Sequence, residues 1–297
     1  MSNASLTLPQ STAFVERPRP TLARQVGQFF RQNRIGAIGV VVIILVILVA
    51  IAAPIISPYK PTSQDAKRLL PPSAQYYLGT DELGRDVFSR IVYGSRISLQ
   101  VGIIAVTIAL ALGATIGVLS GYIGGTFDNL LMRLVDIMFS IPSLVLAIVI
   151  AGLLGSSITN AMIAIGITYA PAFARVTRGS VLSVKNEVYL EAARVVGGRD
   201  LHIIWHYILP NIIAPVIVLT TLQMSTAILT EAALSFLGLG TQPPDPSWGV
   251  MLSNGRKFME SAPWVAVFPG LAIVVAVLGF NFLGDGLRDA LDPRLRE

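Results

Sequence analysis

The 297-residue sequence contains no cysteine and only two histidines. It can therefore form no disulfide framework, no cysteine-ligated zinc or iron–sulfur site and no cysteine nucleophile. Charged residues make up 13% of the chain, about half of the ~25% typical of soluble domains, while 53% are hydrophobic and the mean hydropathy is +0.68. These proportions exclude a soluble enzyme, a disordered chain and a basic nucleic-acid-binding arm, so no nucleic-acid partner is expected.

Lysine is also scarce, which bears on nucleotide chemistry. The only lysines are Lys60, Lys67, Lys185 and Lys257, and none follows a glycine, so the chain has no Walker A phosphate loop. No G-x-S-x-G nucleophile elbow is present either. We therefore expect a transport subunit rather than an enzyme, with no cofactor bound by this chain. Energy for uphill transport would come from ion coupling or from a partner.

Long apolar stretches without charge are what the sequence does contain. Because lipid offers the backbone no hydrogen-bond partner, and because these runs lack period-2 alternation, they predict helices. The expected fold class is an all-α integral membrane protein with six transmembrane helices. The expected spans are residues 35–57, 98–120, 130–153, 160–177, 211–236 and 265–284.

The distribution of basic residues predicts the orientation of these spans. An even number of spans places both termini on one side, and that side is the more basic one, which the positive-inside rule makes cytoplasmic. We expect cytoplasmic tails at 1–34 and 285–297, an outer loop at 58–97 and a cytoplasmic loop at 178–210. The basic residues on the cytoplasmic side are Arg17, Arg19, Arg24, Arg31, Arg34, Arg133, Arg175, Arg178, Lys185, Arg194, Arg199, Arg288, Arg294 and Arg296.

The cytoplasmic loop has the pattern of two short amphipathic helices joined by glycines. The first helix carries an apolar face at spacings of i, i+3, i+4 and i+7, formed by Tyr189, Ala192, Ala193 and Val196. Gly197 and Gly198 suit a left-handed cap, and Asp200 suits the N-cap of a second helix. The second face comprises Leu201, Ile204, Trp205 and Ile208. The pattern alone fits equally a docking surface for a partner and a hairpin resting on lipid headgroups.

The same loop resembles the EAA loop of bacterial ABC importer permeases. Glu191, Ala192 and Ala193, then Gly197, then Leu209 and Pro210 follow that motif at its spacing, with Tyr207 in place of an isoleucine. The resemblance implies a type I permease fold and a coupling helix, within Tyr189 to Asp200, that docks into a groove of a separate ATPase subunit.

Three further segments resemble the C-type subunit of the dipeptide, oligopeptide and nickel branch of that family. They are LGTDELGRDVFSR from Leu78, LSFLGLGTQPPDPSWGVML from Leu234 and FNFLGDGLRDALDPRLRE from Phe280. The likeness extends from about Gln28 to the C-terminus. It implies an inner-membrane permease that forms half of the pathway for di- or oligopeptides. Its implied partners are a second permease, ATPase subunits that carry ATP and Mg²⁺, an external substrate-binding protein and membrane lipid. Glutathione or nickel complexes are alternative solutes.

Polar residues in the fifth expected span are candidates for the solute pathway, because a helix facing only lipid has little use for them. The candidates are Gln223, Thr226, Thr230 and Glu231. Small-residue packing is the competing explanation for the threonines. Glu231 is either a structural residue, protonated or paired with Arg96 or Arg256, or a pathway group that meets the cationic end of a peptide.

Two other patterns have plainer interpretations. His202 and His206 are spaced i, i+4, but two histidines without a third ligand make a weak metal site, so none is expected. Residues 78–99 predict an amphipathic helix on the outer interface, with Thr80 or Asp81 as its cap and an Asp86–Arg90 pair. The rival function is an ion-coupled carrier without an ATPase, which would require more ionisable groups inside the membrane than Glu231 alone.

Overall fold

The computed structural model describes residues 33–291, and within this range every named element is helical. The long helices are α2 (Arg34–Ile56), α3 (Val87–Ile123), α6 (Ile158–Lys185), α9 (Leu209–Phe236) and α11 (Trp264–Leu291). Shorter ones are α4 (Gly125–Phe139), α5 (Ser143–Leu154), α7 (Val188–Val195), α8 (Asp200–Ile203), the π-helix η1 (Ile204–Ile208), α10 (Trp248–Gly255) and the 3₁₀-helix η2 (Arg256–Phe258). The expected all-α fold is confirmed.

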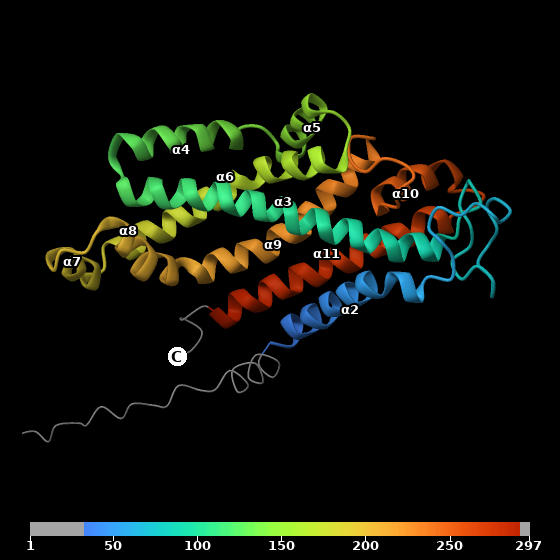
Figure 1. The fold of residues 1–297 in the computed structure, drawn as a ribbon, viewed down its shortest axis with the longest axis horizontal. Helices are drawn as coiled ribbons and strands as arrows, with labels where there is room; N and C mark the ends of the chain where they lie inside the picture. Colours follow the sequence, from blue (N-terminus) through green and yellow to red (C-terminus); the bar gives the residue numbers. More distant parts are fainter. Residues whose placement is uncertain (1–32, 292–297) are drawn as a thin grey trace, which may run out of the picture.

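The helices form a slab with two distinct ends (Figure 1). α3, α6, α9, α11 and α2 run along its length, and α4 lies along one edge. α7 and α8 lie at one end, while the segment 57–86 and α10 lie at the other. The start of α2 and the end of α11 both point toward the α7 end, so the two ends of the described range lie on the same side as the expected coupling loop.

The expected number of six spans is not confirmed by length and composition. Four helical stretches are long and apolar enough to cross a membrane: α2, α3, the continuous run Asp200–Phe236 and α11. The expected single span 130–153 is wrong as a straight helix, because α4 and α5 meet at 92° and together supply at most a fifth, broken span. The break coincides with Pro142, which lacks a backbone N–H and disfavours helix at the residue before it.

α6 covers the expected span 160–177 but is not among the apolar candidates. Its environment explains why a more polar helix is tolerated there. α6 packs along α3 and also contacts α9, α5 and α4, so much of its surface meets protein instead of lipid.

Glycines allow α3 and α6 to approach closely. A Cβ added to Gly113 would lie 2.2 Å from the Ala170 carbonyl oxygen, and one added to Gly117 would lie 2.5 Å from that of Ala174. These glycines are one helical turn apart and therefore face α6 together. Small residues in this arrangement are how membrane helices gain van der Waals contact where lipid supplies no hydrophobic drive.

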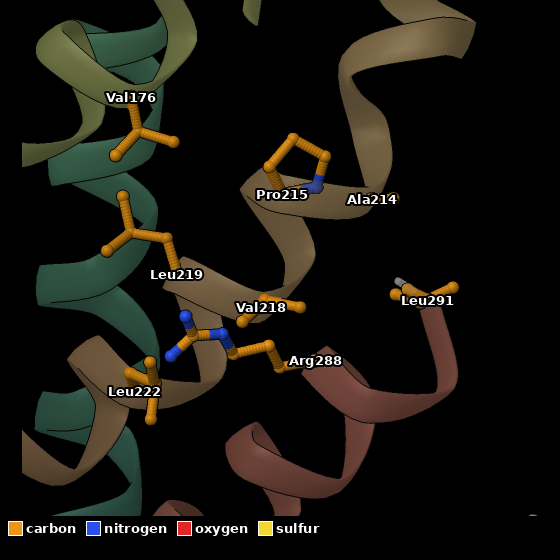
Figure 2. Close-up of a pocket in the computed structure, with 8 residues that line it drawn as sticks. All are labelled: Val176, Ala214, Pro215, Val218, Leu219, Leu222, Arg288 and Leu291. Carbon is orange, nitrogen blue, oxygen red and sulfur yellow. The ribbon is translucent and has the colours of Figure 1, made fainter. Parts of the chain in front are cut away.

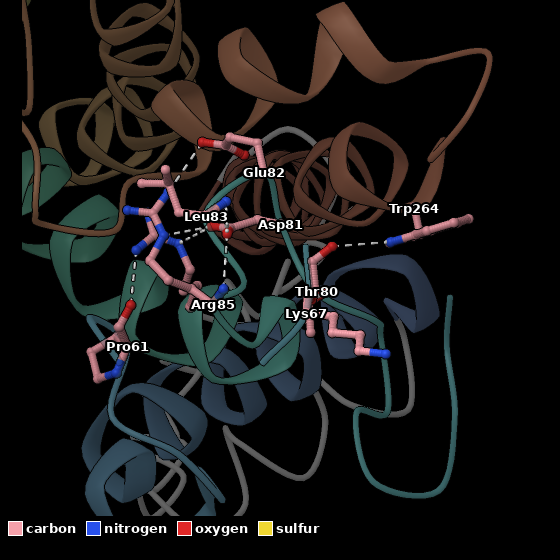
Figure 3. Close-up of polar contacts among 9 residues, drawn as sticks. Pro61, Lys67, Thr80, Asp81, Glu82, Leu83, Arg85 and Trp264 are labelled. Atoms are coloured by element: carbon pink, nitrogen blue, oxygen red, sulfur yellow. Dashed lines mark hydrogen bonds and ion pairs between the residues drawn. The ribbon is translucent and has the colours of Figure 1, made fainter. Parts of the chain in front are cut away.

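The segment 57–86 is held to α3 by a buried charge network (Figure 3). The Asp81 carboxylate accepts a hydrogen bond from Arg85 Nε at 2.6 Å and pairs with Arg90 Nε at 3.4 Å. Arg90 also donates to the Pro61 carbonyl at 2.8 Å, and Trp264 Nε1 donates to the Thr80 carbonyl at 3.3 Å. All four charged and polar side chains of Thr80, Asp81, Arg85 and Arg90 are buried.

This network corrects three expectations for residues 78–99. There is no separate interfacial helix, because α3 begins at Val87 and continues to Ile123. Its N-cap is Asp86, whose carboxylate accepts a hydrogen bond from the Ser89 backbone N–H at 2.8 Å, so neither Thr80 nor Asp81 caps it. Arg90 pairs with Asp81 and not with Asp86.

Candidate functional site

The candidate coupling surface is formed by α7, α8 and η1 at one end of the bundle. α7 ends in a Schellman motif, in which the Gly198 N–H donates to the Ala193 carbonyl at 2.9 Å and the Gly197 N–H donates to the Arg194 carbonyl at 3.0 Å. Gly197 has a φ of +88°, the left-handed conformation that the sequence predicted for this cap. Asp200 is the first residue of α8, and Arg199 is its N-cap, so the expected capping role of Asp200 is wrong.

One buried leucine anchors α7 to the bundle. Leu190 is fully buried and packs in a cluster with Val118 of α3 and Val181 of α6, completed by Ile203, Ile208 and Ile212. The Tyr122 hydroxyl of α3 donates to the Asp200 carboxylate at 2.5 Å, and the Arg194 guanidinium lies 6.0 Å from the centre of the Tyr122 ring. The coupling surface is thus attached to α3 and α6 and runs without a break into α9.

Apolar side chains on this end remain uncovered. Val196 is 88% exposed, Val195 87% and Leu201 68%. A hollow of about 430 Å³ lies beside them, lined by Tyr189, Ala192, Ala193, Val196, Gly197, Gly198, His202 and Tyr207. Glu191 is exposed on the same helix, whereas Leu209 and Pro210 begin α9. The sequence-predicted residues from Tyr189 to Gly198 therefore share one concave surface, apart from Glu191.

The apolar face predicted for the second helix is divided between the surface and the bundle. Leu201 and Trp205 are exposed, whereas Ile203 and Ile208 are fully buried. Part of this face lies in η1, a π-helical turn whose register departs from the 3.6 residues per turn on which the pattern was counted. Sequence reasoning also missed Leu190 and Tyr122, since Leu190 lies off the predicted face and Tyr122 is far away in the sequence. The rings of His202 and His206, the pair considered above as a weak metal site, stack with their centres 4.1 Å apart.

The candidate pathway residues lie on α9, with Gln223 at its middle and the other three in its second half. Gln223, Thr230 and Glu231 are buried within this chain, and Thr226 is part-buried. The Thr230 hydroxyl is 2.6 Å from the Tyr169 hydroxyl of α6, and the Thr226 hydroxyl donates to the Leu222 carbonyl at 3.1 Å. The structure does not bring the four together in one cluster.

Glu231 is the centre of a cluster of hydroxyl groups. Its Oε1 accepts hydrogen bonds from Ser235 at 2.7 Å, Ser247 at 2.8 Å and Thr241 at 3.3 Å. Its Oε2 is buried without a partner in the described part of the chain. Of the alternatives for Glu231, the arginine pair is not formed, since no ion pair involves Glu231 within residues 33–291 and Arg256 lies instead over the Phe236 ring. The carboxyl group thus fastens the 237–247 segment to α9.

Comparison with known proteins decides which family this helical bundle represents. Residues 113–297 match the family described as the binding-protein-dependent transport system inner membrane component. The chain belongs to this family. Residues 21–72 of the permease match the N-terminal transmembrane domain of oligopeptide transport permease C. The expected family and its C-type branch are therefore confirmed. The expectation that the chain is a transport component of an ABC importer, and not an enzyme, is confirmed as well.

Relatives cover nearly the whole permease. It is 50% identical to the dipeptide transport system permease protein DppC of Alkalihalophilus pseudofirmus, over 92% of this chain and 90% of that protein. It is 44% identical to the di/tripeptide transport system permease protein DppC of Pseudomonas aeruginosa, over 99% of both. It is 48% identical to the glutathione transport system permease protein GsiD of Pectobacterium atrosepticum, over 76% of this chain and 75% of that protein.

A solved structure agrees with the fold. The MetNI methionine ABC transporter in an inward-facing conformation matches with a TM-score of 0.57 at 19% identity, over 68% of this chain and 97% of that chain. The permease is accordingly a multi-pass protein of the inner membrane, and an importer of this kind works with ATPase and substrate-binding partners.

Proposed function

We propose that this permease forms one half of the membrane pathway for di- and oligopeptides, and that a separate ATPase drives it through the coupling surface on α7 and α8. A second, similar permease would supply the other half, and the ATP and Mg²⁺ would be bound by the ATPase subunits. The exposed apolar end of α7 carries the proposal, because Val195 and Val196 are almost fully uncovered in a region that is otherwise firmly anchored.

The attachments of α7 suit it to transmit force. Leu190 ties it to α3 and α6, and the Tyr122–Asp200 hydrogen bond ties the neighbouring α8 to α3. Because α8, η1 and α9 form one uninterrupted helical run, displacement of α7 would be passed to α9 and its polar residues. The mechanism is then a helix bundle with two states whose balance is shifted by the ATPase.

The orientation belongs to the same proposal. The coupling surface, the start of α2 and the end of α11 share one end of the bundle, and we assign that end to the cytoplasm. The concentration of arginine around these segments supports the assignment by the positive-inside rule. The 57–86 segment and α10 would then face the external binding protein.

The pathway is assigned to the polar side of α9. We infer that Thr226, which is only part-buried in this chain, faces the pathway in the assembled transporter, and that the buried Gln223 and Thr230 support α9 beside it. Glu231 takes part through the 237–247 segment that it holds, because its side chain is only 1% exposed.

The solute class rests on the names of the relatives, among which those for dipeptides and di/tripeptides cover the most of this chain. Glutathione, itself a small peptide, is the second candidate, since relatives named for it are 48% identical. Uptake of labelled dipeptides, tripeptides and glutathione by the reconstituted transporter separates the two.

Site-specific crosslinking tests the docking proposal. Because the permease contains no cysteine, an introduced cysteine is the single thiol on this chain. Val196→Cys places a single thiol on the coupling surface, and Ser73→Cys places one in the 57–86 segment at the other end. A thiol-reactive crosslinker should join Val196→Cys, but not Ser73→Cys, to the ATPase subunit. In intact cells, a membrane-impermeant maleimide should label only Ser73→Cys.

Two results would contradict the proposal. Labelling of Val196→Cys from outside the cell would reverse the orientation. A purified permease that takes up peptide with no ATPase present would favour the ion-coupled carrier.

A further inference from the structure

A groove between three helices opens near the α7 end of the bundle (Figure 2). It has a volume of about 400 Å³ and lies between α6, α9 and the last turns of α11. Seven of its eight lining residues carry only hydrocarbon side chains, and the eighth is an arginine. The lining residues are Val176, Ala214, Pro215, Val218, Leu219, Leu222, Arg288 and Leu291.

Arg288 has no acidic partner in the groove. Figure 2 shows its side chain extending from α11 toward Val218 and Leu222 of α9. No ion pair involves it within residues 33–291, and the nearby Asp289 accepts a hydrogen bond from Asn33 at 3.0 Å. An exposed cation beside an apolar groove is complementary to a ligand with an anionic head and a hydrocarbon tail.

The depth of Arg288 in the membrane fits the same ligand. The uncharged part of α11, residues 264–284, is about 30 Å long, which is about the thickness of the hydrocarbon layer. Arg288 lies about 6 Å beyond its end, at the level of the headgroups. The groove residues on α9 lie alongside, so a chain seated among them would run into the hydrocarbon layer.

We propose that this groove binds an anionic phospholipid, with one acyl chain against α9 and the headgroup phosphate at Arg288. Basic pockets between membrane helices are a recurrent setting for such lipids. The site is separate from the coupling surface and does not depend on ATPase docking. The bound lipid would fill the gap between α9 and α11 where the side chains leave space.

Native mass spectrometry of the complete transporter in mild detergent tests this directly. The probes are short-chain phosphatidylglycerol and short-chain phosphatidylcholine, titrated separately. Arg288→Gln should weaken phosphatidylglycerol binding roughly fivefold, the effect of about one lost arginine–headgroup contact. It should weaken phosphatidylcholine binding less, because the choline of that headgroup offsets the charge of its phosphate. Arg133→Gln is the matched control, because Arg133 is also exposed but lies on α4 away from the groove.

A second pair of variants tests the acyl chain. Ala214→Phe fills the groove and should weaken binding of both lipids, whereas Ile213→Phe alters the neighbouring exposed position and should weaken neither. The proposal is overturned if Arg288→Gln binds phosphatidylglycerol as the wild type does, or if Arg133→Gln loses as much. It is overturned equally if Ala214→Phe leaves both lipids bound.

Discussion

Replacing Gly197 tests the coupling surface through its backbone. Gly197 closes the Schellman motif of α7 at a φ of +88°. A Cβ added there would meet no other atom within 4 Å, so a substitution introduces backbone strain without a steric clash. Gly198 differs, because a Cβ there would lie 2.7 Å from the Ala193 carbonyl oxygen.

The expected size of the effect follows from the left-handed conformation. A residue other than glycine or asparagine costs about 1–2 kcal/mol of conformational free energy in the left-handed region, and a β-branched residue costs the most. The exposed end of α7 can release the strain by fraying, so Gly197→Val should leave global stability nearly unchanged. If the ATPase binds only α7 with an intact cap, part of the binding free energy must restore the cap of the variant. We expect the affinity for the ATPase to fall about five- to thirtyfold.

The assay is a titration of purified ATPase subunits onto the permease in lipid nanodiscs, followed by measurement of binding-protein-stimulated ATP hydrolysis. Gly197→Asn is the control, because asparagine tolerates the left-handed region while adding a side chain of similar size. It should bind within about twofold of the wild type. If Gly197→Val binds the ATPase and stimulates hydrolysis as the wild type does, the coupling role of this cap is refuted.

Three further changes probe the bundle itself. Asp81→Ala would leave Arg90 buried without a carboxylate and Arg85 with Glu82 alone, and should destabilise the permease by about 3 kcal/mol, measured by thermal unfolding of the purified complex. Gly117→Leu should prevent the close approach of α3 to α6 and abolish folded expression, measured by size-exclusion chromatography. Glu231→Gln should alter peptide uptake in reconstituted vesicles while the complex still assembles, because the amide accepts the three hydroxyl bonds less strongly.

The first two changes have controls in the same chain, and the third has an outcome that would contradict it. Asp65→Ala changes an exposed carboxylate in the same segment as Asp81 and should leave the melting temperature in place. Gly179→Leu adds a side chain where no atom lies within 4 Å and should fold normally. Normal uptake by Glu231→Gln of peptides of every charge would remove Glu231 from the pathway proposal.

Features encoded by neighbouring residues were predictable from the sequence. The all-α membrane class followed from uncharged runs, since the hydrocarbon thickness and the backbone's need for hydrogen bonds leave helices as the solution. The cap at Gly197 followed from a double glycine after an amphipathic turn, and the family followed from the EAA spacing. Each of these features is written in the order of residues along one continuous stretch of the chain.

Features that depend on distant residues required the tertiary structure. The sequence suggested Asp86 as the partner of Arg90 because they are one turn apart, but folding of the 57–86 segment buried Arg90 against Asp81. Likewise Glu231 is bonded by the hydroxyl of Ser235 on its own helix and by those of Thr241 and Ser247 in the 237–247 segment, instead of by an arginine. The 92° angle at the proline break between α4 and α5, the π-helical turn η1 and the groove formed by α6, α9 and α11 at Arg288 are also not specified by a one-dimensional periodicity.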